Sequence, residues 1–369
     1  MTARRINPGL VIAAAGVLAI FILYLWLTLA AASYTLGCDY LAYDGAARAW
    51  LAGRTPYDTA VTAAGSCGTY QYPPPFLLLI VPLTVLPPAA AMWVFIIASA
   101  VCLPLAVLAM PVPAPARIIT LALAGTSWPV LFAVKVGALG PFLLLLFALA
   151  WRWLDRPARL AAVTALGTFA KVLPGLLGLW MLLTGRYRAA WITIGIGVVV
   201  ALPWLLVQPA VWWDYLAVER TISTTVTEAP ANFAPASLLY FAGLPMPTAL
   251  ALGGLHTLVV LALVVLVARR GSRDASLIVT AVASQVVAPV LWDHYTVVLF
   301  LAVAWLISRR QWWIAILATA MNAMFIAWLP PLTWVGSLDL AMAGVAAVDL
   351  LQRRRALASA PTAATGVLA

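Results

Sequence analysis

Long apolar runs separated by short polar turns dominate the chain. About thirteen such runs follow one another between Gly9 and Leu350, and the longer ones reach the ~20 residues that a helix needs to cross a bilayer. The run Phe76–Leu86 is short and has prolines on both sides, so we expect it either to cross as a short helix or to be re-entrant. The pattern predicts an all-α polytopic membrane protein with about twelve transmembrane or re-entrant helices.

Arginine clusters alternate with longer polar segments between these runs. Basic residues are typical of cytoplasmic loops, so the clusters predict a cytoplasmic N-terminus, a cytoplasmic tail at 353–369 and exterior loops at 33–75 and 208–236. No segment between runs is long enough for a separate soluble domain, which indicates a single membrane domain over 1–369. The clusters lie at 152–159, 186–188, 269–273, 309–310 and 353–355, with Arg4 and Arg5 before the first run.

The first exterior loop has its own helical pattern. Tyr40, Tyr43, Ala47 and Trp50 recur at three- and four-residue spacing, with charged residues between them. This spacing predicts an amphipathic helix that lies along the membrane surface, ended by the glycine and proline that follow residue 52.

Two of the three cysteines, Cys38 and Cys67, fall in this loop. Disulfides persist outside the cytoplasm, so the pair is a possible disulfide. The alternative is two free thiols that lie too far apart to join.

Composition agrees with a membrane protein and excludes a soluble one. Hydrophobic residues make up 65% of the chain, the mean hydropathy is +1.05 and only 9% of residues are charged. The net charge of +10 does not indicate nucleic acid, because the arginines lie in short clusters between apolar runs.

A few polar residues interrupt the apolar pattern where chemistry can occur. Asp39 opens the exterior loop and Lys171 occupies the turn between the runs Leu160–Ala170 and Val172–Leu183. A lysine at this depth is costly unless it faces a cavity or an anion, although it could also snorkel to the interface. His294 lies beside Asp293 after a long apolar run, where it is either functional or simply a polar residue at a helix end.

The second exterior loop combines aromatic rings with carboxylates. Trp212 next to Asp214 suits the stacking of a sugar ring, but paired tryptophans are equally typical of an interfacial aromatic belt.

The residue types present exclude several chemistries. The chain has no G-x-x-x-x-G-K-[ST] phosphate loop, no cysteine and histidine spacing for zinc and no G-x-S-x-G elbow. A lone exterior carboxylate with a histidine and a lysine on the same side fits a transfer reaction in which the leaving group is already activated. We expect no metal ion and no cofactor.

Five short motifs occur in an order and spacing that resemble glycosyltransferase family 87. They are Asp39 with Tyr43, then Gly53 with Pro56-Tyr57, then Tyr72-Pro73-Pro74, then Lys171 with Pro174, and last Trp292-Asp293-His294-Tyr295. The resemblance implies a GT-C fold and, as in the best-understood members, mannosyl transfer from a polyprenyl-phosphate donor.

The resemblance also assigns roles to individual residues. Asp39 matches the general base, while His294 and Lys171 match residues beside the donor phosphate. The remaining candidates are possible substrate contacts: Asp44, Tyr43, Tyr72, Trp212, Asp214, Asn232, Asp293 and Tyr295.

The sequence thus predicts an inverting hexosyltransferase, with mannose as the expected sugar, in the cytoplasmic membrane. Its active site is expected on the exterior face, with a lipid-linked sugar as donor and a hydroxyl of a glycolipid or glycan as acceptor. Two alternatives are a transporter or flippase of a lipid-linked sugar and an inactive family member. The chain has no internal repeat of the kind that many transporters carry.

Overall fold

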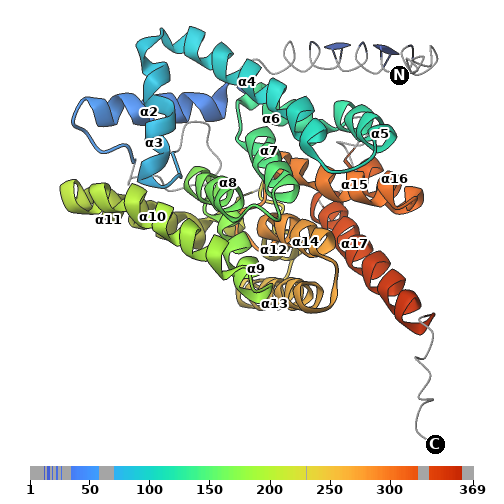
Figure 1. Ribbon diagram of the computed structural model, residues 1–369. Helices are drawn as coiled ribbons and strands as arrows, with labels where there is room; N and C mark the ends of the chain where they lie inside the picture. Colours follow the sequence, from blue (N-terminus) through green and yellow to red (C-terminus); the bar gives the residue numbers. More distant parts are fainter. Residues whose placement is uncertain are drawn as a thin grey trace, which may run out of the picture.

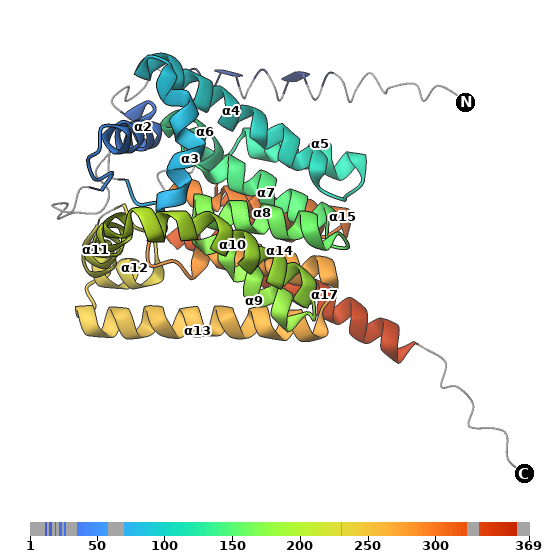
Figure 2. The ribbon, with the colours of Figure 1, turned by 60° about the vertical axis from the view of Figure 1, so that its left-hand side comes forward.

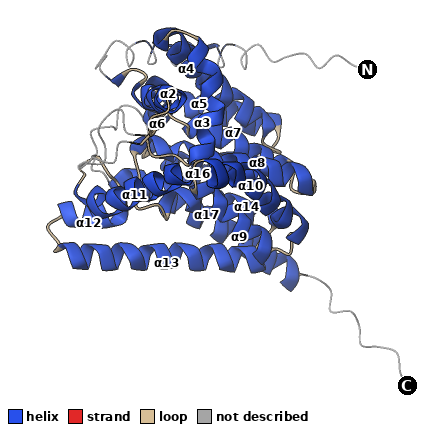
Figure 3. Cartoon of the chain, turned by 90° about the vertical axis from the view of Figure 1, so that its left-hand side faces the viewer, coloured by secondary structure: helices blue, strands red, loops and turns tan. Residues whose placement is uncertain are grey.

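The computed structural model describes residues 35–57, 70–229, 231–322 and 332–359, with isolated positions between 12 and 26. These ranges form helices joined by short loops, with no strand among them (Figure 3). The predicted first crossing, Gly9–Ala32, lies almost wholly outside the described residues.

The described helices follow one another with short connections (Figure 1). The α-helices are α2 (Cys38–Leu51), α3 (Leu77–Ile80), α4 (Pro88–Ala109), α5 (Ala114–Gly125), α6 (Trp128–Val136), α7 (Gly140–Arg152), α8 (Pro157–Ala170), α9 (Leu176–Leu183), α10 (Tyr187–Val207), α11 (Pro209–Thr225), α12 (Pro235–Phe241), α13 (Met246–Arg270), α14 (Arg273–Val286), α15 (Leu299–Ser308), α16 (Trp312–Ala320) and α17 (Leu332–Ala358). Short 3-10 segments are η2 (Pro74–Phe76), η3 (Val81–Val85), η4 (Leu173–Gly175), η5 (Val226–Glu228) and η6 (Asp293–Val298).

Proline marks where many of these helices begin. α4 to α8 and α11 to α13 all carry proline in the first turn. The first turn tolerates proline because its N–H groups have no partner within the helix and its φ angle is already suitable. Prolines therefore cut a nearly continuous apolar sequence into separate helices.

The centre of the bundle is formed by α14 and α15. In α14 every residue from Ala275 to Val286 is buried, and in α15 so is every residue from Leu299 to Ile307. A helix that is buried on all sides needs neighbours all around it, and α7, α9, α13 and α17 supply them.

Within the described ranges, four helices are long and apolar enough to cross a membrane: Pro88–Ala109, Tyr187–Val207, Met246–Arg270 and Thr333–Ala358. The pair α6 and α7 forms a fifth candidate, bent by 114°. α4, α10 and α13 expose rows of large apolar side chains such as Ile97, Val199 and Leu258, as expected for surfaces that face lipid. The apolar helices thus support a membrane-embedded protein.

The number of crossings stays a prediction. Between the long helices lie apolar helices of 10–17 residues, which include Ala114–Gly125 and Leu173–Leu183. Such helices are shorter than the ~30 Å hydrocarbon core. Their length therefore does not show that they cross the membrane, and only the pattern of apolar runs in the sequence predicts that they do.

Three of the predicted basic clusters meet at one end of the molecule. Arg273 donates a hydrogen bond to Asp155 at 2.6 Å, and Arg186 donates to the carbonyl of Leu154. These contacts join the chain before α8, before α10 and at the start of α14, as the alternation of charge predicts.

The two predicted exterior loops meet at the other end. Trp50 Nε1 donates to Gln208 Oε1 at 2.7 Å, and Thr55 Oγ1 donates to Asp214 Oδ2 at 2.6 Å. α2, α11 and α12 gather at this end, and α17 leaves the bundle at the opposite end (Figure 2). α10 joins the two ends, and its 21 residues correspond to about 30 Å of helix.

The expected surface helix is present as α2, which ends just before Gly53 as predicted. One face of α2, with Tyr40, Tyr43 and Ala47, is buried against the bundle. That the helix lies along a membrane surface stays a prediction.

A glycine turn aligns α2 with the bent pair. Gly137, between α6 and α7, has φ of 69°, and a Cβ there would lie 2.9 Å from the Cβ of Tyr40. This close approach lets α2 pack on the turn from which α7 begins.

We expect Gly137→Ala to be clearly less stable than Gly185→Ala. Both positions have φ near 70°, but a Cβ at Gly185 meets nothing within 4 Å. Backbone strain alone predicts a loss of about 1 kcal/mol for Gly185→Ala, whereas Gly137→Ala adds a clash with Tyr40. Thermal unfolding in detergent measures both, and equal losses would show that the contact with Tyr40 is unimportant.

Candidate active site

Asp39 is positioned by the turn that starts α2. Gly37 precedes the helix in a left-handed conformation, with φ of 67°, and its N–H donates to the carbonyl of Lys135 at 2.9 Å. Asp39 thereby falls in the first turn of α2 beside the end of α6, with 28% of its side chain exposed.

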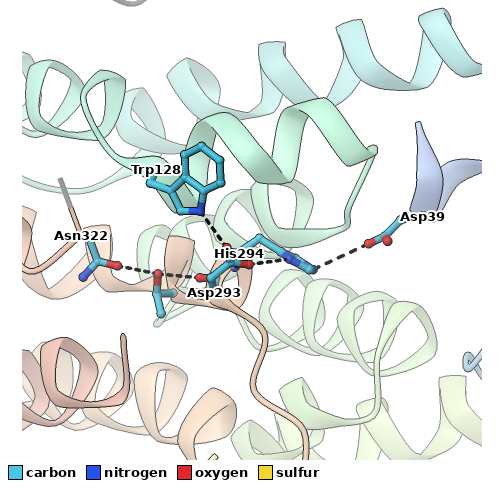
Figure 4. Close-up of polar contacts among 6 residues, drawn as sticks. Asp39, Trp128, Asp293, His294 and Asn322 are labelled. Carbon is cyan, nitrogen blue, oxygen red and sulfur yellow. Dashed lines mark hydrogen bonds and ion pairs between the residues drawn. The ribbon is translucent and has the colours of Figure 1, made fainter. Parts of the chain in front are cut away.

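His294 is held by a network on the segment that follows α14. The carboxylate of Asp293 accepts a hydrogen bond from Trp128 Nε1 at 2.7 Å and another from the backbone N–H of His294 at 2.7 Å. Asp293 Oδ1 also lies 3.2 Å from His294 Nδ1 (Figure 4). With Asp293 accepting at Nδ1, the other ring nitrogen is left for the site.

A second contact anchors this segment from behind. Thr296 Oγ1 bonds both the carbonyl of Asp293, at 2.9 Å, and Asn322 Oδ1, at 2.7 Å, while the carbonyl of Asn322 accepts from the N–H of Trp128 at 3.0 Å. The ring of His294 is therefore fixed through Asp293 by α6 and by the end of α16.

The free nitrogen of His294 faces Asp39. His294 Nε2 lies 3.7 Å from Asp39 Oδ2, across residues that are 255 positions apart in the chain. Figure 4 shows the two side chains pointing toward each other from different elements. Among the described residues, the Asp39 carboxylate accepts no hydrogen bond closer than this contact.

Lys171 completes the group from the turn after α8. Its backbone is extended, and its Nζ lies over the ring of Tyr295, 2.8 Å from the centroid. No ion pair joins Lys171 to a carboxylate within the described ranges. The ammonium group thus rests on an aromatic face with its N–H donors available to an anion.

These side chains line one small pocket, which we call the Asp39 pocket. Its empty volume is about 240 Å³, and the chamber beside it has an empty volume of about 580 Å³. Its lining residues are Asp39, Tyr72, Ala138, Leu139, Gly140, Leu143, Lys171, Gln285, His294 and Tyr295.

Burial makes Asp39 a stronger base than an ordinary aspartate. Desolvation raises the pKa of the Asp39 carboxyl, and the negative charge of Asp293 adds to this effect. The positive charges of His294 and Lys171 act in the opposite direction and lower the same pKa.

A comparison of the chain with known protein families identifies the kind of protein that contains this pocket. The model of glycosyltransferase family 87 matches residues 70–289, which is more than half of the chain. The chain belongs to glycosyltransferase family 87. No curated protein matches it, and no solved structure does either. The matched segment includes Tyr72 and Lys171, whereas Asp39 precedes it and His294 follows it.

Membership of family 87 makes the protein a glycosyltransferase, and its apolar helices suit a lipid-linked substrate. Five of the residues that the sequence singled out line the Asp39 pocket: Asp39, Tyr72, Lys171, His294 and Tyr295. A sixth, Asp293, lies directly behind His294. Tyr43 supports the pocket from outside, since its hydroxyl lies 2.9 Å from that of Tyr72.

Asp44 does not join this group. Its carboxylate is buried and accepts from Arg48 Nε at 2.7 Å, and Arg48 also donates to the carbonyl of Leu86 at 2.9 Å. The i, i+4 ion pair engages Asp44 in holding α2, so it does not line the Asp39 pocket.

Trp212 and Asp214 also lie outside the Asp39 pocket. Trp212 packs edge-on against Tyr215, and Asp214 accepts its hydrogen bond from Thr55. Neither residue lines the Asp39 pocket, and the contact of Trp212 and Asp214 with a sugar stays a prediction.

Asn232 connects two loops through side-chain hydrogen bonds. It is 1% exposed and uses its whole amide: Nδ2 donates to the carbonyls of Val226 and Pro289, and Oδ1 accepts from the N–H groups of Ala234 and Leu291. With these bonds formed, Asn232 has no group left for a substrate and instead fixes the chain just before His294.

The structure describes only one of the two cysteines of the expected disulfide. Cys38 is disulfide-bonded, whereas Cys67 lies outside the described residues.

Sequence reasoning missed the residues that orient His294 and line its surroundings. Trp128, Thr296 and Asn322 are distant in the chain, and their types are ordinary in apolar helices. Gln285 lines the pocket from inside α14, and a buried glutamine in an otherwise apolar helix is a feature that could have pointed to it.

Among the described residues, no group of three or more His, Cys, Asp or Glu side chains could hold a metal ion. That transfer needs no metal stays a prediction.

We expect Asn232→Ala to destabilise the protein by about 3 kcal/mol, because it leaves the N–H groups of two buried residues, Ala234 and Leu291, without this partner and removes two hydrogen bonds to carbonyls. Thermal unfolding in detergent measures the loss. Asp214→Asn is the control, since it changes a side chain at the surface and should shift stability by less than about 0.5 kcal/mol. A stable Asn232→Ala protein that lost only activity would instead restore Asn232 as a substrate contact.

Proposed function

We propose that this glycosyltransferase moves a hexose, mannose in the first instance, from a polyprenyl-phosphate donor to a hydroxyl of a glycolipid or glycan. The reaction inverts the configuration at the anomeric carbon, so that a β-linked donor gives an α-linked product. One observation carries the proposal: in a member of family 87, the Asp39 carboxylate faces His294 at 3.7 Å in a pocket that also contains Lys171, and within the described residues it accepts no closer hydrogen bond.

In this mechanism Asp39 is the general base. It takes the proton from the acceptor hydroxyl while that oxygen attacks the anomeric carbon, and the bond from this carbon to the phosphate oxygen breaks. The bonding electron pair leaves with the polyprenyl phosphate. The raised pKa of Asp39 suits the role, because general bases are most effective when their pKa approaches the working pH.

The departing phosphate gains negative charge, which cations on the pocket wall stabilise. Lys171 offers N–H donors that no described carboxylate occupies, and His294 offers an N–H at Nε2 when the ring is protonated. Donors arranged before the reaction stabilise developing charge without reorganisation, an effect commonly worth 10²–10³-fold in rate for each group.

We assign the pocket to the exterior face of the cytoplasmic membrane, with both termini in the cytoplasm. The support is the distance between the two ends: α8, with its 14 residues, separates Lys171 from the basic end by about 21 Å of helix. Transport of a lipid-linked sugar, the other function class that the sequence allowed, finds no support in the family match.

Asp39→Asn is expected to lower transfer by about 10²–10⁴-fold, because the amide cannot take the proton. The assay uses purified protein, radiolabelled polyprenyl-phosphate mannose and membrane lipids, with new glycolipid as the product. Folding should persist, since no short hydrogen bond to Asp39 is lost among the described residues.

Asp155→Asn serves as the matched control, because it also removes an aspartate charge but at the basic end. We expect ordinary activity from it. Full activity in Asp39→Asn would remove Asp39 as the base, and movement of donor without new glycolipid would favour transport.

The pH profile should respond to Lys171 in a defined direction. Asp39 works ionised, and burial raises its pKa, so the acidic limb of kcat/KM should lie above the ordinary aspartate value of 3.8. Lys171→Met removes a charge that lowers this pKa, so the limb should move to still higher pH, and the rate should fall by about 10²-fold.

Lys171→Arg is the comparison, since it keeps the positive charge and should leave the limb near its original position. An acidic limb that stays in place in Lys171→Met would separate Lys171 from the base electrostatically.

A further inference from the structure

A second chamber lies beside the Asp39 pocket and shares part of its wall. The two spaces have Tyr72, Lys171 and Tyr295 in common. The second space, which we call the Glu219 chamber, has an empty volume of about 580 Å³, part of it open to solvent. Its other lining residues are Gln71, Val172, Leu173, Tyr215, Glu219, Ile222, Ala288, Pro289 and Val290.

One face of α11 lines this chamber. Tyr215, Glu219 and Ile222 are spaced at i, i+4 and i+7 and therefore point the same way, into the chamber. Asp214 and Trp213 belong to another face, and Trp213 is 70% exposed. α11 thus presents one carboxylate to the chamber and another carboxylate away from it.

Glu219 has no hydrogen-bonding partner in the part of the chain that the structure describes. It forms neither a hydrogen bond nor an ion pair with any described residue, although it is partly buried. Desolvation raises the pKa of Glu219 to about 7, and the charge of Lys171 lowers it. A desolvated carboxylate without a partner is unfavourable unless a ligand supplies hydrogen-bond donors.

The remaining lining suits a sugar ring. Tyr72, Tyr215 and Tyr295 offer aromatic faces to which the C–H groups of a sugar can pack, and Gln71 and Glu219 offer polar groups for its hydroxyls. The apolar residues at 172–173 and 288–290 close the remaining sides.

Charge connects this chamber to the reaction site. Lys171 interacts electrostatically with both Asp39 and Glu219, and both carboxylates also act on Tyr72. A ligand in the Glu219 chamber therefore ends at the same wall that borders the proposed base.

We propose that the Glu219 chamber binds the sugar unit of the acceptor, with the Glu219 carboxylate accepting hydrogen bonds from two of its hydroxyl groups. The inference rests on the proposed function and adds to it that the acceptor is a glycan or glycolipid with a sugar next to the new linkage. Glu219 is then the residue that selects this sugar.

The test is a split between the two substrates. The protein is reconstituted in lipid nanodiscs with polyprenyl-phosphate mannose as donor and octyl α-D-mannopyranoside as acceptor. Glu219→Ala should raise the KM for the glycoside about tenfold or more, which is the effect expected from losing hydrogen bonds to a charged group. The KM for the donor should stay within about twofold.

Two further variants separate recognition from structure. Glu219→Gln keeps hydrogen-bonding capacity without the charge, so its KM for the glycoside should fall between wild type and Glu219→Ala. Asp214→Asn, on the other face of α11, should keep both KM values. An unchanged KM for the glycoside in Glu219→Ala, or a rise confined to the donor, would overturn the assignment.

A binding measurement decides the question without turnover. Val290→Cys, at a lining residue that leaves Glu219 intact, and Asp214→Cys are labelled with a water-soluble methanethiosulfonate reagent, with wild type as background. Octyl α-D-mannopyranoside should slow labelling at position 290 at least about threefold and leave position 214 unaffected. Equal labelling with and without glycoside would overturn the chamber. Protection in a protein that never cleaves the donor would instead retain the chamber and reject the proposed function.

Discussion

Desolvation and two nearby cations act on the Asp39 carboxylate in opposite directions, and the site depends on their balance. Burial raises the pKa of Asp39, while His294 and Lys171 lower it. With burial alone, the carboxylate would tend to hold a proton and could not accept one. With the cations alone, it would be a weak base. The structure places all three side chains on one pocket, where both effects operate.

The fold supplies this balance by bringing three remote segments to one end. The turn at Gly37 starts α2 beside α6, α8 ends at Lys171, and the segment after α14 carries His294. None of these positions lies inside one of the five candidate crossings. The long helices act as a frame, and the chemistry occupies the ends of shorter elements, where backbone turns and polar groups are tolerated.

The sequence singled out Asp39, Lys171 and His294 because charge is rare in this chain. With 9% charged residues, an acid, a lysine and a histidine on the same side of the alternating pattern stand out. The positive-inside alternation assigned the clusters at 152–159 and 269–273 to the same side, and the structure brings Arg273 to within 2.6 Å of Asp155. The family resemblance, found in short motifs, was confirmed by the match over 70–289.

Partners that depend on three-dimensional packing escaped the sequence. Asn232 is of a residue type that can bind sugar hydroxyls, but only the fold reveals that its side chain forms its hydrogen bonds within the protein. His256 belongs to the apolar helix α13, yet its Nε2 lies 3.0 Å from Asp339 Oδ2, which is 83 positions away on α17. The pairing of Asp44 with Arg48 is different, since an i, i+4 spacing makes it readable from the sequence.

Lys171 links substrate binding to base strength because it borders both spaces. In the proposed mechanism, a donor phosphate against Lys171 would offset the positive charge that lowers the pKa of Asp39. Asp39 would then be a stronger base with donor bound than without it. The acceptor sugar proposed for the Glu219 chamber would meet the same lysine, with which Glu219 also interacts. A single cation near both carboxylates would thereby make the proton affinity of Asp39 depend on whether the donor is present, and proton transfer would be favoured only once the leaving phosphate is in position.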